Sequence, residues 1–238
     1  MNIRTYRPIP LGLTLLIALF SALAALAVSG GHNAHAHGDT GHHATGSAEA
    51  DHQDNGKITR KELALRNDMR RLWEDHITWT RLAIISLTTD APDTEATVGR
   101  LLENQTDIGD AVKPFYGQAA GNELTRQLRL HILIAAEVVA AAQAGDEAKL
   151  ADAQARWRSN ADDIAGVLNS VNPRHWKLPV MKAEMSKHLA LTTEEAVARI
   201  QGNWAADVAA YDEIHGHILH MSDLLSTGLV KQFPRRFR

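Results

Sequence analysis

Hydrophobic residues spaced three and four positions apart recur along the chain from about residue 57 to its end. This spacing puts apolar side chains on one face of a helix, and the strong helix formers Ala, Leu, Glu, Arg and Gln dominate the segment. No run of alternating apolar and polar residues indicates a strand. The pattern predicts an all-α fold, an antiparallel helical bundle with four long helices and additional short helices.

Breaking and capping residues set the expected helix boundaries. The helices are predicted over 60–88, 93–113, 119–144, 146–170, 179–191 and 192–230. Asn104 and Gly109 interrupt the apolar pattern, so the segment 93–113 is expected to hold weaker, shorter helices. Thr192 or Thr193 is the predicted N-cap of the last helix, because acidic residues follow it at capping-box spacing.

Residues 1–36 have the pattern of a secretory signal segment. Arg4 and Arg7 precede an apolar run over 11–28, and small-residue cleavage sites occur at 25–27 and 34–36. The run is just long enough to span a bilayer, so a retained anchor is the alternative. We therefore expect an exported protein, periplasmic or extracellular, that contacts a membrane only if the signal segment stays uncleaved.

Residues 37–57 are predicted to form a disordered, histidine-rich linker ahead of a helical bundle domain over 58–238. The histidines in and beside it are His32, His35, His37, His42, His43 and His52. Imidazoles at this density in a flexible tract bind Zn, Cu or Ni loosely. The alternative is a spacer in which histidine is merely tolerated.

Composition limits the chemistry of the chain. It contains no cysteine, which excludes disulfides, thiolate metal ligands and cysteine nucleophiles, so a metal site must use His, Asp, Glu or Met. The formal net charge is −3, and no basic face is evident before the C-terminal tail, so we expect no nucleic acid partner. No nucleophile elbow or phosphate-binding glycine loop is present to indicate catalysis.

The segment 51–62 resembles an EF-hand calcium loop, with Gly56 at the position of the sharp turn. Its candidate ligands are Asp51, Gln53, Asn55 and Glu62. Gln53 replaces the usual Asp or Asn, and no helical pattern precedes the loop, so any calcium site would be weak. The alternative is a capping box in which Thr59 caps the first helix and Glu62 reaches back to it.

Several predicted helices each place one polar residue on an otherwise apolar face. These residues are His76, His131, His188 and Asp207, with Asn160 in a similar position. Buried imidazoles and carboxylates need partners, so they should find one another or a metal. Three histidines and one carboxylate suit Zn, Cu or Fe, with Asp207 as a ligand or as an acceptor for a ligating histidine. The alternative is a hydrogen-bonded polar network in the core.

A second candidate site lies on the last predicted helix. Glu213, His217 and His220 are spaced four and three residues apart and therefore share one face. Three such side chains offer a local surface for a divalent metal, open to a further ligand or water. The alternative is a solvated polar face.

Several short segments are similar to a group of bacterial, mostly exported helical-domain proteins of unknown activity. The segments are 72–81, 114–117, 160–164, 188–192 and 232–234. The resemblance covers about residues 63–235 and implies one helical domain, with His76, His131, His188 and Asp207 as positions of interest. It implies no activity, and it does not include the histidine tract, the calcium-like loop or the histidines of the last helix.

Together these patterns predict an exported helical-bundle protein that buffers, carries or senses a divalent transition metal. One alternative is an interaction or ligand-binding module without metal, whose histidines, Asp207 and Asn160 form a structural core network. The other is a metalloenzyme of unknown reaction, which requires His76, His131, His188 and Asp207 to converge.

Overall fold

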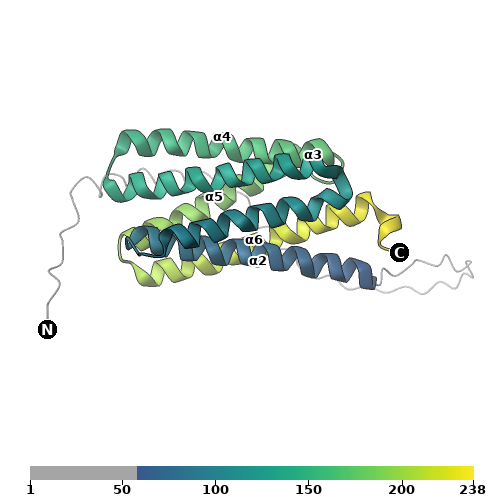
Figure 1. Ribbon diagram of the computed structural model, residues 1–238, viewed down its shortest axis with the longest axis horizontal. Coiled ribbons are helices and arrows are strands. Elements are labelled where there is room, and N and C mark those ends of the chain that lie inside the picture. Colours follow the sequence, from purple (N-terminus) through teal and green to yellow (C-terminus); the bar gives the residue numbers. More distant parts are fainter. Residues whose placement is uncertain (1–57) are drawn as a thin grey trace, which may run out of the picture.

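The computed structural model describes residues 58–238, which are all-α as predicted (Figure 1). The helices are α2 (Arg60–Thr88), α3 (Thr94–Ala144), α4 (Glu147–Val171), α5 (Leu178–Ile200) and α6 (Trp204–Gln232), and a short 3-10 turn, η1 (Pro234–Arg236), follows. Within 58–238 no strand occurs. The predicted signal segment, the linker, the histidine tract and the candidate calcium ligands Asp51, Gln53 and Asn55 lie outside the described residues.

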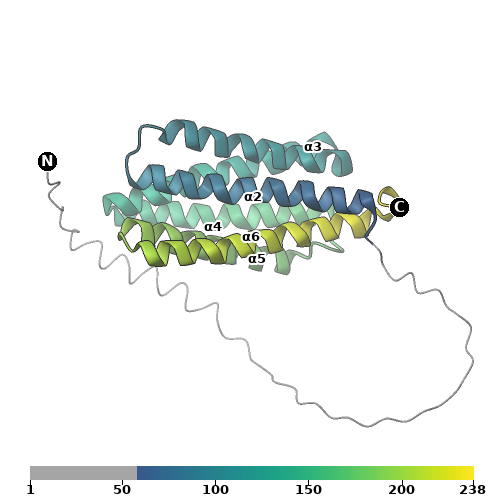
Figure 2. The same cartoon turned by 90° about the horizontal axis from the view of Figure 1, so that it is seen from below.

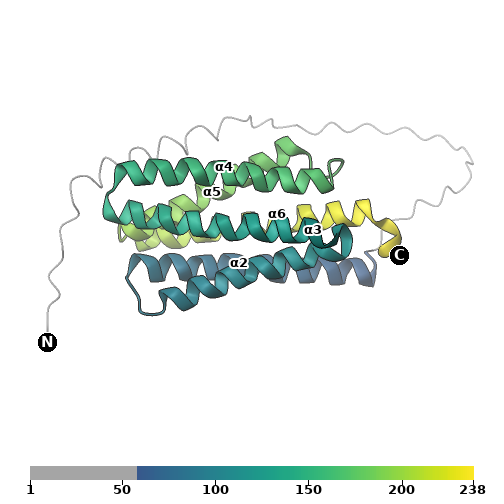
Figure 3. The same cartoon turned by 45° about the horizontal axis from the view of Figure 1, so that its top comes forward.

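Successive helical segments run back and forth along the long axis of the molecule, and α3 folds back on itself (Figure 3). The reversal occurs at Gly117, whose φ of 83° and ψ of 171° are not helical. The two arms of α3 approach closely where glycines meet, since a Cβ on Gly109 would lie 2.7 Å from the carbonyl oxygen of Gly121. The first arm is helical through Asn104 and Gly109 up to this reversal, so the prediction of separate short helices over 93–113 is wrong.

The predicted boundary between the last two helices is also wrong. Helix α5 continues through the expected break to Ile200, and the chain turns at Gly202, whose φ of 70° suits glycine. Asn203 is the N-cap of α6, and its side chain accepts a hydrogen bond from the backbone N–H of Ala206. The Thr192 hydroxyl instead donates to the carbonyl of His188 inside α5. The number and lengths of the helices thus differ from those predicted.

The start of α2 lies beside the C-terminal end of the chain (Figure 2). The Thr59 hydroxyl oxygen accepts a hydrogen bond from the backbone N–H of Glu62 and donates one to the carbonyl of Phe237 at 2.5 Å. Thr59 therefore caps α2 as predicted. The Glu62 carboxylate does not reach back, because it pairs with Arg66 at 2.8 Å.

The core runs between the helices along the length of the molecule. Helix α2 packs against α3 and α6, α4 packs against α3 and α5, and α5 packs against α6. Fully buried side chains in this core include Ile77, Ile108, Ile164, Ile214 and Leu229. Within 58–238 no helix is both long and apolar enough to cross a membrane.

Candidate functional site

Three of the four predicted core residues come together around His188. The ring centroid of His188 lies 5.8 Å from that of His76 and 5.9 Å from that of His131. His217 also stacks on His188, with the ring centroids 6.4 Å apart and the ring planes 25° apart. Helices α2, α3, α5 and α6 thus each contribute one buried imidazole. We call these four residues the histidine cluster.

His217 was predicted to lie on an outer metal-binding face, yet it is buried. A sequence signal for its burial exists, because Ile214 and Met221 precede and follow it at three and four residues. That spacing puts His217 on the same apolar stripe that defined the other core residues.

His131 is fully hydrogen-bonded within the protein. The Trp157 indole N–H donates to Nε2 of His131 at 3.2 Å, so Nδ1 carries the ring hydrogen and donates to Oδ1 of Asn160 at 2.8 Å. The Asn160 amide in turn donates to Oε1 of Gln127 at 2.9 Å. This part of the cluster is the polar network that the sequence offered as an alternative to a metal site.

His76 and His188 are less completely satisfied. The Gln105 amide nitrogen lies 3.2 Å from Nδ1 of His76, but it also faces the Leu101 carbonyl at 2.8 Å and Oδ1 of Asn104 at 3.1 Å. An amide has two hydrogens for these three acceptors. Nδ1 of His188 is buried without any hydrogen-bond partner, a situation that costs about 1–3 kcal/mol. His188 therefore has a ring nitrogen whose hydrogen-bonding capacity no described residue uses.

Burial keeps the cluster uncharged. Desolvation lowers the pKa of His76 and of His131 to about 4. It lowers the pKa of His188 well below the usual 6.5, and the neighbouring imidazoles add to the effect. Burial also lowers the pKa of His217. At neutral pH all four rings are neutral, which is the form that coordinates metal ions.

His76, His131 and His188 line a cavity of about 30 Å³ in the middle of the molecule. Met69, Met185 and Met221 line the same cavity. Its remaining wall is aliphatic and aromatic, with no charged side chain, and its surface is almost wholly apolar, so the imidazole nitrogens contribute little to it. We call this space the histidine–methionine cavity.

Asp207, the fourth predicted core residue, is buried away from the histidines. Its carboxylate accepts hydrogen bonds from Arg81 at 2.9 and 3.2 Å and from Arg199 at 3.2 Å. Arg81 also donates to Glu195 at 2.8 Å. The predicted site of three histidines and Asp207 is therefore not assembled. Arginines, not histidines, contact the Asp207 carboxylate.

The ion-pair cluster of Arg81, Glu195, Arg199 and Asp207 has its own electrostatics. Burial alone would lower the pKa of Arg81, but hydrogen bonds to Asp207 and Glu195 outweigh it and raise the pKa. Burial raises the pKa of Glu195 to about 7, despite its hydrogen bond to Arg81. The sequence argument missed Glu195 because it assigned this residue to the first turn of a helix starting at 192.

The second predicted set, Glu213 with His217 and His220, is not brought together. Glu213 is exposed and lies near Glu194, whose pKa is raised by burial and then by the Glu213 charge. The carboxylate that faces both histidines is Glu184 of α5. Its Oε2 lies 3.7 Å from Nδ1 of His217, and its Oε1 lies 3.6 Å from Nε2 of His220.

The contact between His217 and Glu184 joins two acceptors. Nε2 of His217 lies 3.1 Å from the backbone carbonyl of Glu184, which can only accept, so Nε2 carries the hydrogen. In the neutral ring, Nδ1 then carries a lone pair, and this nitrogen lies 3.7 Å from Oε2 of Glu184. A separation of 3.7 Å is also too long for a hydrogen bond. We call Glu184, His217 and His220 the α5–α6 site.

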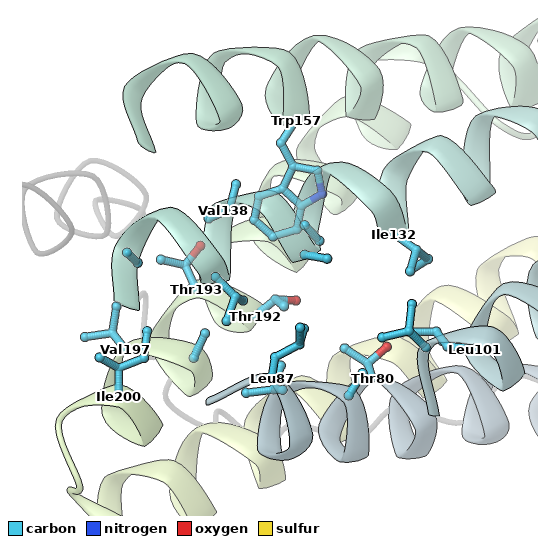
Figure 4. Close-up of a pocket in the computed structure, with 18 residues that line it drawn as sticks. Thr80, Leu87, Leu101, Ile132, Val138, Trp157, Thr192, Thr193, Val197 and Ile200 are labelled. Carbon is cyan, nitrogen blue, oxygen red and sulfur yellow. The ribbon is translucent and has the colours of Figure 1, made fainter. Parts of the chain in front are cut away.

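A second cavity, of about 50 Å³, lies next to the histidine cluster and has an almost wholly apolar lining (Figure 4). The hydroxyls of Thr80 and Thr192 point back to the carbonyls of His76 and His188 in their own helices, at 2.7 and 2.8 Å. Since no charged side chain lines it, this cavity suits only a small apolar group.

Within 58–238, no group of three or more His, Asp or Glu side chains is arranged, as it stands, to hold a metal ion. Comparisons of the chain with family models, curated proteins and solved structures find no match. The resemblance to exported bacterial helical proteins stays a prediction. Inference about function therefore rests on the geometry of the residues themselves.

Proposed function

We propose that this protein is an exported metal-binding protein that holds a divalent transition metal, such as Zn, Cu or Ni, at the α5–α6 site. The observation that carries the proposal is the lone pair of His217 Nδ1 facing the Glu184 carboxylate. Two acceptors repel each other, and a cation between them replaces the repulsion with two favourable bonds. Imidazole and carboxylate are ordinary ligands of these metals.

The surroundings of His217 support this role. A ligating histidine usually donates its other ring N–H to a carbonyl or carboxylate, which fixes the tautomer and the ring orientation. The hydrogen bond from Nε2 of His217 to the Glu184 carbonyl provides this support. Nδ1 of His217 therefore keeps a free lone pair that can coordinate a metal ion.

The distances require only a small adjustment. Ligand atoms around a tetrahedral ion with bonds of about 2.0–2.1 Å are roughly 3.3 Å apart. Glu184 presents a different oxygen to each histidine, Oε2 to Nδ1 of His217 at 3.7 Å and Oε1 to Nε2 of His220 at 3.6 Å. Each separation exceeds the tetrahedral value by a few tenths of an ångström. His220 has 62% of its side chain exposed, so it is free to rotate toward the carboxylate. The remaining coordination positions would face solvent, as suits buffering, carrying or sensing a metal.

The test is a metal titration of the mature, untagged protein, with the tract histidines changed to asparagine so that only the helical domain is measured. Affinity for Zn²⁺ is compared for the parent, Glu184→Gln, His220→Ala and His215→Ala. His215, on the same helix, bonds to Glu74 instead and is the matched control. We expect the first two changes to weaken binding by about tenfold or more and the control to bind like the parent. Equal affinity in all four proteins would refute the site.

A second candidate function is a module without metal, whose histidine cluster is structural. The observation that favours it is His131, whose two ring nitrogens are both occupied by Asn160 and Trp157. A ligand that binds the folded state raises its stability in proportion to the logarithm of its concentration over Kd. If this candidate is right, saturating Zn²⁺ leaves the melting temperature of the tract-free protein unchanged.

A further inference from the structure

Exposed basic side chains gather at the end of the molecule where α2 begins and the chain finishes (Figure 2). Hydrogen bonds hold several chain segments together there. Arg236 donates to the Pro114 carbonyl beside the reversal of α3. Gln232 donates to the Val171 carbonyl at the end of α4. We call the exposed basic residues on these segments the basic end: Arg60, Lys61, Arg174, Lys177, Lys231, Arg235, Arg236 and Arg238.

Carboxylates do not neutralise the basic end. On the sides of the bundle, exposed basic side chains pair with acids, as Arg70 does with Asp223. Within 58–238, no residue of the basic end forms an ion pair with a carboxylate. Desolvation lowers the pKa of His175, and the positive charges of Arg174 and Lys231 lower it further. Positive potential is therefore concentrated at this end.

The opposite end of the molecule carries acidic residues. The turns from α2 to α3 and from α3 to α4 lie there (Figure 3), and the acids in or beside them include Asp90, Asp93, Glu95 and Glu147. The formal net charge of the chain is −3, so an anionic surface repels the molecule as a whole. Such a surface attracts the molecule only when the basic end faces it, and the charge distribution thus selects one orientation.

Exposed apolar side chains lie beside the basic side chains. Ile58 and Leu63, at the start of α2, are 58% and 50% exposed, and Val180, in the first turn of α5, is 41% exposed. A hydrated anionic polymer offers such side chains no apolar partner. A membrane surface combines negative headgroups with an apolar layer beneath them, so it accommodates both kinds of side chain.

We propose that the basic end docks the domain onto the surface of an anionic phospholipid bilayer. The proposal does not rest on the α5–α6 site. The chain that precedes the described residues, with its apolar run over 11–28, joins the domain at this same end. Each Lys or Arg near an anionic bilayer strengthens binding by about fivefold. Docking of this kind brings the domain to a membrane even when the signal segment is cleaved.

The test is co-sedimentation of the mature, untagged protein, which lacks the apolar run, with lipid vesicles. The vesicles contain phosphatidylglycerol and phosphatidylcholine, or phosphatidylcholine alone, and EDTA prevents a metal ion from bridging histidines and phosphates. The first variant removes three charges from the basic end: Arg174→Gln, Lys177→Gln and Arg235→Gln. The matched control removes three exposed charges from the sides of α2, α4 and α5: Arg71→Gln, Arg158→Gln and Lys187→Gln. A third protein keeps every charge of the basic end: Arg174→Lys, Lys177→Arg and Arg235→Lys.

We expect the parent to bind the anionic vesicles at about 0.1 M salt and to dissociate at about 1 M salt, where charges are screened within about 3 Å. It should not bind phosphatidylcholine alone. The first variant should have a partition coefficient at least about tenfold lower, while the control and the charge-conserving protein bind like the parent. The proposal is overturned if the parent binds neither vesicle, if it binds both equally, or if the first variant and the control behave alike. Self-association in gel filtration, or binding to a short DNA duplex, without vesicle binding would assign the basic end to a second copy or to a nucleic acid and would also overturn it.

Discussion

Acidification should destabilise this protein through its buried neutral histidines. The pKa values of His76 and His131 are about 4 in the folded state, against 6.5 as the ordinary value. Below pH 6.5 the unfolded chain therefore takes up protons that the folded protein refuses, and stability falls as the pH falls. Between about pH 7.5 and about pH 5, proton linkage gives a loss of about 2 kcal/mol for each ring. His188 adds a further loss in the same direction.

The assay is urea unfolding followed by tryptophan fluorescence, with a chelator present, at about pH 7.5, 6 and 5. The informative quantity is the loss of unfolding free energy between the pH limits, measured within each protein. His131→Gln should lose about 2 kcal/mol less than the parent over this range, whatever its stability at neutral pH. Ile134→Val, a buried neighbour on α3 without a titrating group, is the matched control. It should be less stable by about 0.5–1.5 kcal/mol at every pH and should keep the full acid loss.

A specific result would refute this reasoning. If His131→Gln and Ile134→Val lose the same free energy on acidification, the His131 ring takes up its proton as easily in the folded state as in the unfolded one. Burial would then not be keeping the histidine cluster neutral.

Two further outcomes follow from single contacts. Glu195 has a pKa raised to about 7, so its contribution to stability is present at low pH and is lost as the pH rises through 7. Glu195→Gln removes this gain, and the acid loss in the same urea series should grow by about 2 kcal/mol. Gly109→Ala puts a Cβ 2.7 Å from the Gly121 carbonyl and should lower the unfolding free energy by about 1–3 kcal/mol. Gly99→Ala in the same arm meets nothing within 4 Å and should be neutral or stabilising, so equal melting temperatures for the two variants would contradict the close packing.

The sequence was sufficient to predict a helix where a capping side chain marks its start and a turn marks its end. Helix α2 was predicted over 60–88 and is observed at Arg60–Thr88, because Thr59 caps its start and the turn before Pro92 ends it. The prediction that a helix begins at 192 or 193 was wrong, because a threonine followed by acidic residues has the same pattern at an N-cap and in a helix interior. Glu195 is held in the interior by Arg81, which lies 114 residues away in the chain. No local pattern contains that contact.

The candidate sites show the same division. Apolar spacing at three and four residues was enough to predict that His76, His131, His188 and Asp207 are buried, and all four are. Spacing along each helix does not give the relative heights of different helices, so it could not show that Asp207 sits with arginines. Glu184 was missed for the same reason, since the packing of α5 on α6 after the turn at Gly202 decides which carboxylate meets His217.

The positions of the carboxylates along the molecule distinguish the histidine cluster from the α5–α6 site. Arg81 follows His76 by five residues on α2, so the ion-pair cluster lies roughly 7 Å along the helix from the histidine cluster. Because Arg81 and Arg199 hold Asp207, this carboxylate is not available to the histidine cluster. Glu184 instead faces the lone pair of His217 where α5 meets α6, beside the exposed His220. A divalent ion bound there would gain a negative ligand and would keep contact with water, neither of which the histidine cluster offers.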